Sequence, residues 1–443
     1  MDNHKIRDLI MVLFAFLFAL LSPRALLGAN IPSIADVVEG KASPPTIEDL
    51  TGGKVKNNGL VDKNNVELVK NYLTASMYES VKRGMVLKMG TQLPPDQLNP
   101  KVFRDITEKN RGKAIIDKNG VVYYEKMGTL WPGGRPFPVV KSGVEAMANS
   151  TFGKPWDTYM IDPARLCYIN SKGEIYKTVD QTFMYVKYTT RTMIPPLGAV
   201  PGSENVLVKR IAVAAEPREI KGLGQFTVRY YDPAKQYDTG FAYLPAFKRT
   251  IRISATTWQD NIAGSDAIYG DGDGFNEPYY DWNLKLIEKK FLLVPEPKMS
   301  VRLTDQKMNI NKDFQFDVGK KYPRLGWVIW PVDVVEAIPN YKNVYGKRVL
   351  YFPCWPYSYS YSAIAAVDIY DRQMKLWKNF FFIYGGHEYL NGDRDKPQTS
   401  SVGALTVDLQ SEHRTLMLYT QLLNTNKIGT DSLSLGKLIE MGR

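Results

Sequence analysis

Apolar and polar residues alternate most clearly between residues 224 and 295. Two alternating runs, Phe226–Tyr231 and Gly240–Tyr243, flank a turn rich in Asp, Pro and Gly, which predicts a β-hairpin. In Lys248–Ser254, charged residues at 248 and 252 alternate with isoleucines at 251 and 253, the pattern of a strand with one wet and one dry face. We therefore predict a two-faced sheet in this stretch.

A long connection rich in Gly and Asp separates this strand from the next predicted strand, Trp282–Val294. Long loops in compact domains usually carry function, and a Gly-rich loop can move without disturbing the strands it joins. We predict that it forms a lid at the opening of an apolar cavity. The aromatic residues expected near this opening are Trp258, Phe275, Tyr280 and Trp282, and Tyr243 is a further candidate ligand contact.

Most of the chain after about residue 163 has the pattern of strands separated by turn signals. Because few helical patterns interrupt them, we predict an antiparallel meander, and a sheet of so many strands must curl. The expected fold is mainly β (α+β): a large curved antiparallel sheet forms a half-open barrel, with a few helices plugging its concave side. The other predicted strands are 164–170, 173–178, 183–191, 206–215, 326–338, 347–352, 363–370, 376–382, 402–409 and 414–419.

Residues 30–160 are predicted to be a region of loops and helices that packs on the sheet of residues 161–443, as one continuous domain. Apolar residues recur at helical spacing over Asn64–Arg83, which predicts an amphipathic helix. A second helix is expected over Pro100–Asn110, with Pro at its start. Capping-box spacing predicts a third helix start at Ser142–Met147.

The first 29 residues have the layout of a secretory signal. Lys5 and Arg7 precede 13 apolar residues, Leu9–Leu21, and small residues follow at Gly28 and Ala29. The apolar run is too short for an ordinary spanning helix, and no later segment reaches about 18 apolar residues. We expect cleavage near residue 29 and a mature protein in the periplasm.

The chain is basic, with a formal net charge of +11. No arginine-rich arm, zinc-finger spacing or RNP-like sequence occurs, which argues against a nucleic-acid partner. The excess charge suits an anionic membrane face or an acidic partner, and a merely soluble basic surface explains it equally well. Lys248, Arg249 and Arg252 are the candidate contacts to a partner or to lipid headgroups.

Residues suited to catalysis are scarce in this sequence. His387 and His413 are the only histidines after the expected signal, and neither lies in a zinc-ligand or Ser-His motif. His387 and Glu388 are adjacent, so on a strand they would point to opposite faces. No nucleotide-binding or hydrolase fingerprint occurs in a suitable setting. We expect a protein that is not an enzyme and has no cofactor.

A metal site is a weak alternative on the Gly-rich connection. Asp271 and Asp273, with Asp266 or Glu277, could supply oxygen ligands to calcium. The spacing of an EF-hand is missing, and alternating Asp and Gly are common in tight turns. We therefore predict turn chemistry here and no metal.

The two cysteines, Cys167 and Cys354, leave two interpretations open. In an oxidising compartment they could form a disulfide. Both lie in apolar strand-like runs, where free buried thiols are an equally good interpretation.

A run of alternating Tyr and Ser follows Cys354 and ends at Ser362. If it is extended, Tyr357, Tyr359 and Tyr361 lie on one side of a strand. These rings could contact a ligand, so Tyr357 and Tyr359 join the candidate cavity residues. Core or cross-strand packing is the more common role for such rings.

Five stretches in order between residues 133 and 380 resemble those of one protein family. They are GGRPFPVV with SGVEAMAN (133–149), AYLPAFKRTIRIS (242–254), DGFNEPYYDWNLKLIEKKFLLVP (273–295), YGKRVLYF (345–352) and VDIYDRQMKLWKNF (367–380). The family they resemble is the proteobacterial domain-of-unknown-function family numbered 1329. The resemblance implies an exported protein, similar in fold to lipoprotein carriers of the LolA/LolB type, with a half-open antiparallel barrel around a helix-plugged apolar cavity. It also implies a role beside RND-type exporters and outer-membrane proteins.

We therefore expect a non-catalytic periplasmic carrier for a hydrophobic ligand such as a lipid, an acyl chain or an aromatic compound. Desolvation of the apolar ligand would drive binding, at roughly 25 cal/mol per Å² of buried surface. The alternative is a structural or interaction component of an RND-type export or outer-membrane assembly. An unrecognised hydrolase is the least favoured function.

Overall fold

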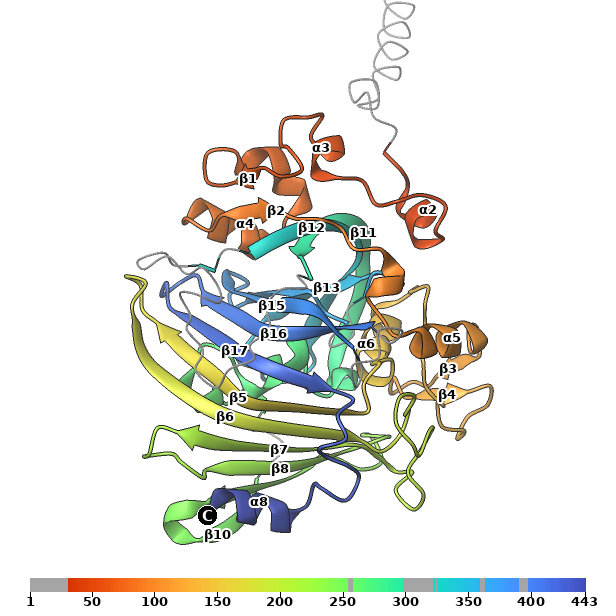
Figure 1. The fold of residues 1–443 in the computed structure, drawn as a ribbon, viewed down its shortest axis with the longest axis vertical. Helices are drawn as coiled ribbons and strands as arrows, with labels where there is room; N and C mark the ends of the chain where they lie inside the picture. Colours follow the sequence, from red (N-terminus) through yellow and green to blue (C-terminus); the bar gives the residue numbers. More distant parts are fainter. Residues whose placement is uncertain (1–30, 254–257, 298–321, 324, 359–362, 390–396) are drawn as a thin grey trace, which may run out of the picture.

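One large sheet dominates the fold (Figure 1). The computed structural model describes residues 31–443 except 254–257, 298–321, 324, 359–362 and 390–396, so the predicted signal peptide lies outside the described residues. Among the described residues, 15 strands form one open sheet and a further pair forms a small hairpin. The predicted mainly β, half-open architecture is confirmed, since the sheet does not close into a barrel.

Two antiparallel meanders make up the sheet, and pairing of β17 with β5 joins them. The strands of the first are β5 (Thr158–Ile169), β6 (Ile175–Lys187), β7 (Val206–Glu216), β8 (Gly224–Tyr230), β9 (Thr239–Leu244) and β10 (Arg249–Ile253). Those of the second are β11 (Trp282–Pro295), β12 (Leu325–Pro339), β13 (Lys347–Pro353), β14 (Ala366–Tyr370), β15 (Leu376–Tyr389), β16 (Pro397–Asp408) and β17 (Arg414–Leu423).

One strand pair departs from the predicted antiparallel arrangement. β2 (Leu87–Met89) lies parallel to the start of β12 and antiparallel to β1 (Leu60–Val61). The small separate hairpin consists of β3 (Ala114–Ile116) and β4 (Val122–Tyr124). The sheet is therefore mixed at this one junction.

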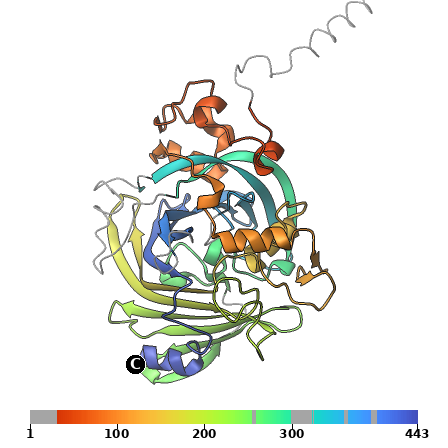
Figure 2. The same ribbon diagram turned by 45° about the vertical axis from the view of Figure 1, so that its right-hand side comes forward.

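The long strands are bent, and Figure 2 shows the sheet curving around a concave face. The pairing register shifts between Leu286 and Glu288 in β11, between Ile161 and Ala164 in β5, and within β15 after Tyr384. Such bulges bend a strand and increase its twist. The curvature gives the sheet an inner side that can enclose a ligand.

The helices are short, and most precede the long strands. They are α2 (Ile34–Val38), α3 (Ile47–Leu50), α4 (Ala75–Lys82), α5 (Lys101–Lys109), α6 (Gly143–Phe152) and α8 (Leu435–Gly442). Helices α5 and α6 confirm two of the predictions, and Ser142 caps α6 by accepting a hydrogen bond from Glu145 N at 3.2 Å. Only half of the capping box forms, because Glu145 accepts from Lys141 N instead of Ser142 N.

The single helix predicted over Asn64–Arg83 is wrong. A 3₁₀ segment, η2 (Val66–Tyr72), ends at Leu73, whose backbone is extended, and α4 then begins afresh. Thr74 causes the break, because its hydroxyl accepts a hydrogen bond from Met77 N at 3.0 Å as an N-cap. The apolar spacing continued across this break, so the pattern alone did not show it.

The strand predictions were correct in type and wrong at several ends. The predicted strands 173–178 and 183–191 are one strand, β6, and β5 begins at Thr158. Lys248 lies outside β10, where it ends the 3₁₀ turn η4 (Pro245–Phe247) in a left-handed conformation with φ of 50°. It therefore does not share a strand face with Arg252, as the alternation predicted.

Candidate functional site

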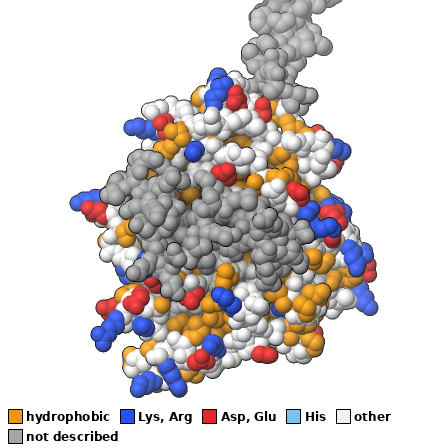
Figure 3. Space-filling view, in the orientation of Figure 1, with side chains coloured by type: hydrophobic (Ala, Val, Ile, Leu, Met, Phe, Trp, Pro, Cys, Tyr) orange, Lys and Arg blue, Asp and Glu red, His pale blue; other side chains and the backbone are white. Residues whose placement is uncertain are grey.

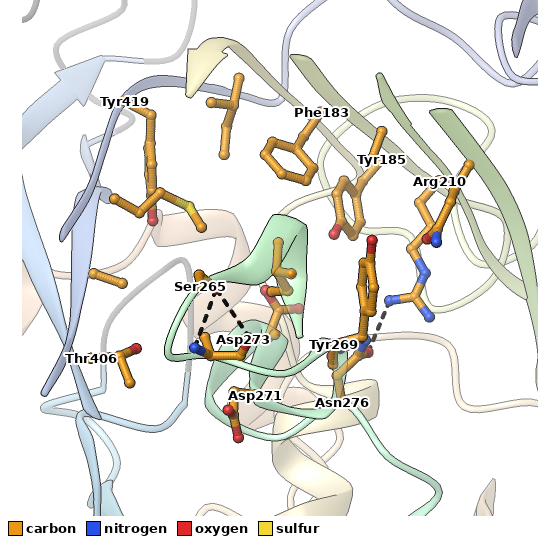
Figure 4. Close-up of a pocket in the computed structure, with 18 of the residues that line it drawn as sticks. Phe183, Tyr185, Arg210, Ser265, Tyr269, Asp271, Asp273, Asn276, Thr406 and Tyr419 are labelled. Atoms are coloured by element: carbon orange, nitrogen blue, oxygen red, sulfur yellow. Dashed lines mark hydrogen bonds between the residues drawn. The ribbon is translucent and has the colours of Figure 1, made fainter. Parts of the chain in front are cut away.

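A cavity lies between the concave face of the sheet and the connection from β10 to β11 (Figure 4). Its volume is about 130 Å³. Strands β5–β8 and β15–β17 line one side, and residues 258–276 line the other. Aromatic rings dominate the lining: Tyr159, Phe183, Tyr185, Trp258, Tyr269, Phe380, Phe382 and Tyr419.

Strand geometry explains why so many rings face the cavity. Residues two apart on a strand share a face, so Phe183 and Tyr185 point the same way, as do Phe380 and Phe382. The rings of Tyr185 and Tyr159 stack with centroids 4.0 Å apart. Burial raises the pKa of Tyr185 above its usual value, so the phenol stays neutral at physiological pH.

In its described part, residues 258–281, the connection covering the cavity forms short 3₁₀ turns and no α-helix. The turns include η6 (Ile262–Gly264), η7 (Tyr269–Gly274) and η8 (Tyr279–Asp281). Helix α4 packs on the other face of β14 and β15, where Ala75 N and Ser76 N each donate to Asp368 at 3.0 Å. At this cavity, the predicted helical plug is therefore replaced by the Gly-rich connection.

A fully buried arginine on β13 holds this connection in place. Arg348 Nη2 donates to Glu277 Oε1 at 2.6 Å and lies 3.3 Å from Asp271 Oδ1, and its Nη1 donates to Gly270 O at 3.1 Å. Tyr345 Oη donates to Asp271 Oδ2 at 2.8 Å, and Asn343 Nδ2 donates to Glu277 Oε2 at 2.9 Å. These contacts fix the middle of the connection to the sheet.

Three further side chains, those of Lys378, Thr415 and Lys154, hold the connection at Asp266 and Asp273. Lys378 Nζ donates to the carbonyl of Asp266 at 2.6 Å, and Thr415 Oγ1 donates to Asp266 Oδ2 at 2.8 Å. Lys154 Nζ donates to Asp273 Oδ2 at 2.6 Å. Burial is the main cause that raises the pKa of Asp266. The four acidic residues considered for calcium thus have protein partners, and within the described ranges no group of three or more His, Cys, Asp or Glu could hold a metal.

Charged residues gather at the end of the cavity formed by β7 and β8. Arg210 Nη1 and Arg229 Nη1 both donate to Asn276 Oδ1, at 2.9 and 3.0 Å (Figure 4 shows the first). Arg229 Nε donates to Asp238 Oδ2 at 3.0 Å. Both guanidinium groups lie over the ring of Trp258, 5.1 and 5.2 Å from its centroid.

Of the aromatic residues predicted at the lid, Trp258 lines the cavity. Phe275 and Trp282 are buried outside the lining, with ring centroids 5.1 Å apart and the Arg348 guanidinium 4.9 and 5.1 Å from the two rings. Tyr280 lies in η8, partly buried and outside the lining. The structure therefore brings one of these four side chains directly to the cavity.

The other predicted ligand contacts lie elsewhere. Tyr243 is the neighbour of Ala242, which pairs with the cavity residue Gln225, so Tyr243 points to the opposite face, where it packs against α8. Tyr357 is buried with its ring 6.1 Å from that of Trp330, in the packing role considered from the sequence. Tyr359 lies outside the described residues.

The predicted partner contacts lie at the edge of the sheet. Arg249 and Arg252 are exposed on β10, and Lys248 is exposed beside them. The lower end of the molecule, where Figure 1 places β10, carries basic side chains beside hydrophobic ones in Figure 3. This placement is compatible with a partner surface and equally with a solvated edge.

Most of the cavity lining was missed in the sequence. The rings of β6 and β15 are spaced i, i+2, as Phe183 with Tyr185 and Phe380 with Phe382, and this signal was available. This spacing did not show which face of each strand lies on the concave side of the sheet. Arg210 was also missed, because nothing local distinguishes it from the neighbouring Lys209.

The histidines considered for catalysis lie in or next to strands β15 and β17. His413 Nδ1 is 3.8 Å from Asp266 Oδ1, at the exposed end of β17, whereas His387 has only its backbone described, in β15.

Cys167 and Cys354 are both buried and free, which decides between the two interpretations in favour of thiols. Burial raises the pKa of Cys167 to about 12.

A family model decides the relationship of this chain to known proteins. The model described as a protein of unknown function, DUF1329, matches residues 60–432. The chain belongs to the DUF1329 family. No curated protein matches it.

Three solved structures are similar to this DUF1329 chain. One is described as a putative outer membrane lipoprotein-sorting protein domain from Vibrio parahaemolyticus, with 16% identity, a TM-score of 0.41, and coverage of 63% of this chain and 91% of that one. A DUF1329 family protein from Desulfovibrio piger has 12% identity, a TM-score of 0.41 and coverage of 64% and 92%. A LolA superfamily protein from Nitrosomonas europaea has 10% identity, a TM-score of 0.37 and coverage of 67% and 99%.

None of the helices in the described part of the chain is long and apolar enough to cross a membrane.

Proposed function

We propose that this DUF1329 protein is a periplasmic, non-catalytic carrier for a hydrophobic molecule. The observation that carries the proposal is the aromatic cavity between the concave face of the sheet and the anchored connection. Enclosed, mostly apolar cavities with a few polar groups are the usual form of a small-molecule site. Removal of the apolar part of a ligand from water would drive binding here.

The size of the cavity limits which ligands it can hold in this conformation. A volume of about 130 Å³ is close to the ~150 Å³ that accommodates one benzene molecule. Sites for drug-sized ligands are usually ~300–1,000 Å³. The cavity therefore suits a single ring or a short acyl segment, and a whole lipid would require the connection to move away from the sheet.

The test is native mass spectrometry of protein purified from the periplasm without detergent. The proposal predicts a bound apolar molecule that leaves on denaturation, and weaker retention in Phe382→Ala, which removes a ring from the lining. Val139→Ala, an exposed apolar position away from the cavity, is the matched control and should retain the molecule. Protein that carries no ligand and also binds no added apolar compound would contradict the carrier function.

The edge strand β10 supports a second candidate, an interaction component of an envelope export assembly. Phe247 and Ile251 are exposed there beside Arg249 and Arg252, which suits an acidic partner surface. Binding to an acidic envelope protein should weaken with salt and in the double variant Arg249→Glu/Arg252→Glu. Association that neither salt nor this variant changes would rule out this use of the edge.

A further inference from the structure

The polar end of the cavity contains two buried N–H groups without an acceptor. Arg210 Nη2 and Trp258 Nε1 have no hydrogen-bond partner, and both residues line the cavity. Arg210 is only 9% exposed, so water does not freely replace the missing acceptor. A buried donor left unpaired costs about 1–3 kcal/mol, and more when it is charged. The nearest carboxylate oxygen, Asp238 Oδ2, lies 3.7 Å from Arg210 Nη2, so an acceptor on a ligand in the cavity could satisfy both donors.

The ion pairs at this end favour an anionic acceptor for Arg210. Among the described residues that surround it, three cations, Lys154, Arg210 and Arg229, face two carboxylates, Asp238 and Asp273. Asp238 serves both arginines, at 3.0 Å from Arg229 Nη2 and 3.7 Å from Arg210 Nη2. Both arginines therefore share the one carboxylate of Asp238, and Arg210 Nη2 lies beyond hydrogen-bond distance from it.

Two neighbouring charged groups have partners of their own. Lys187, on the same side, has its own carboxylate, since its Nζ lies 3.8 Å from Asp157 Oδ1. Asp271 Oδ1 is a further lining atom without a hydrogen bond, and it lies 3.3 Å from Arg348 Nη2.

We propose, resting on the carrier function above, that the ligand is a small amphipathic monoanion: its acidic group binds Arg210 and the indole N–H of Trp258, and its apolar part fills the aromatic cavity. Arginine is suited to this role because its planar guanidinium binds carboxylates through charge-assisted hydrogen bonds. The neighbouring rings then contact the rest of the ligand. The site selects aryl or short acyl acids over neutral molecules of the same shape.

The test compares octanoate with octan-1-ol, which share an apolar chain and differ in charge. Titration calorimetry should show octanoate binding at least about tenfold more tightly, as expected for hydrogen bonds to a charged group. Arg210→Met should weaken octanoate binding by about tenfold or more and leave octan-1-ol unchanged. Lys209→Met, the same charge change one residue earlier on β7, should leave both affinities unchanged.

A second variant covers the case in which Arg210→Met does not fold. Trp258→Phe keeps an aromatic ring but removes the N–H donor, so it should lower the preference for octanoate over octan-1-ol several-fold. Equal affinities for the two ligands in the native protein would overturn the anionic ligand and leave the carrier function standing. Binding of neither ligand would contradict the carrier function itself.

Discussion

The buried anchor Arg348 offers the sharpest prediction about how the cavity is held closed. Arg348→Met keeps most of the side-chain volume and removes the charge that faces Glu277 and Asp271. Arg348 is 0% exposed, and Glu277 and Asp271 are 2% and 3% exposed, so water cannot replace the guanidinium. Breaking a buried pair by removing one partner typically costs about 3–5 kcal/mol. Tyr345 and Asn343 still donate to the two carboxylates, which places the expected loss near the lower end, about 3 kcal/mol.

Urea denaturation followed by circular dichroism measures this loss as a lower midpoint at unchanged slope. The double variant Arg348→Met/Glu277→Gln should recover part of the loss, because it removes one of the unpaired carboxylates. Lys437→Met, which removes the exposed pair with Glu440, is the control and should cost less than about 1 kcal/mol. A loss below about 1 kcal/mol for Arg348→Met would refute the anchoring of the connection.

Three further predictions concern titratable groups. The double variant His387→Ala/His413→Ala should bind octanoate as the native protein does, and loss of binding with unchanged circular dichroism would reopen the search for catalysis. Burial lowers the pKa of Lys187 to about 8 from 10.5, so between these values the unfolded chain binds more protons than the folded one. The free energy of unfolding should therefore rise with pH across this window, by at most about 1.4 kcal/mol per pH unit, relative to Lys187→Met; a flat difference between the two proteins would contradict it. Cys167, buried and with its pKa raised to about 12, should resist thiol-specific labelling until the protein unfolds, and rapid labelling of the native protein would show that it is accessible.

The strand content was predictable because alternation is a local signal. Runs such as 326–338 and 347–352 became β12 and β13 with ends close to those expected. The pairing of β17 with β5, and the parallel contact of β2 with β12, join segments far apart in the chain. No local pattern specifies such neighbours, so the order of strands in the sheet could not be derived.

Part of the candidate site was predictable because its signals are also local in the sequence. The Gly-rich connection was predicted to form a lid over a cavity, and in the structure residues 258–276 line a cavity, with Trp258 among them. Period-2 spacing shows that a strand has two faces, but it does not show which face lies on the concave side of the sheet. Tyr243 was therefore predicted to contact a ligand, although it faces α8. The anchoring of Asp271 depends on Arg348, which lies more than 70 residues away in sequence and became its partner only through the fold.

The most direct test of the central claim is to fill the cavity and measure binding. Ala404 lines it from β16, so Ala404→Phe places a ring in a space of about 130 Å³. Ala234→Phe, at an exposed turn, is the control for added hydrophobicity. In titration calorimetry with octanoate, the native protein and Ala234→Phe should bind equally, and folded Ala404→Phe should not bind. Equal binding by all three proteins would show that the ligand does not enter this cavity.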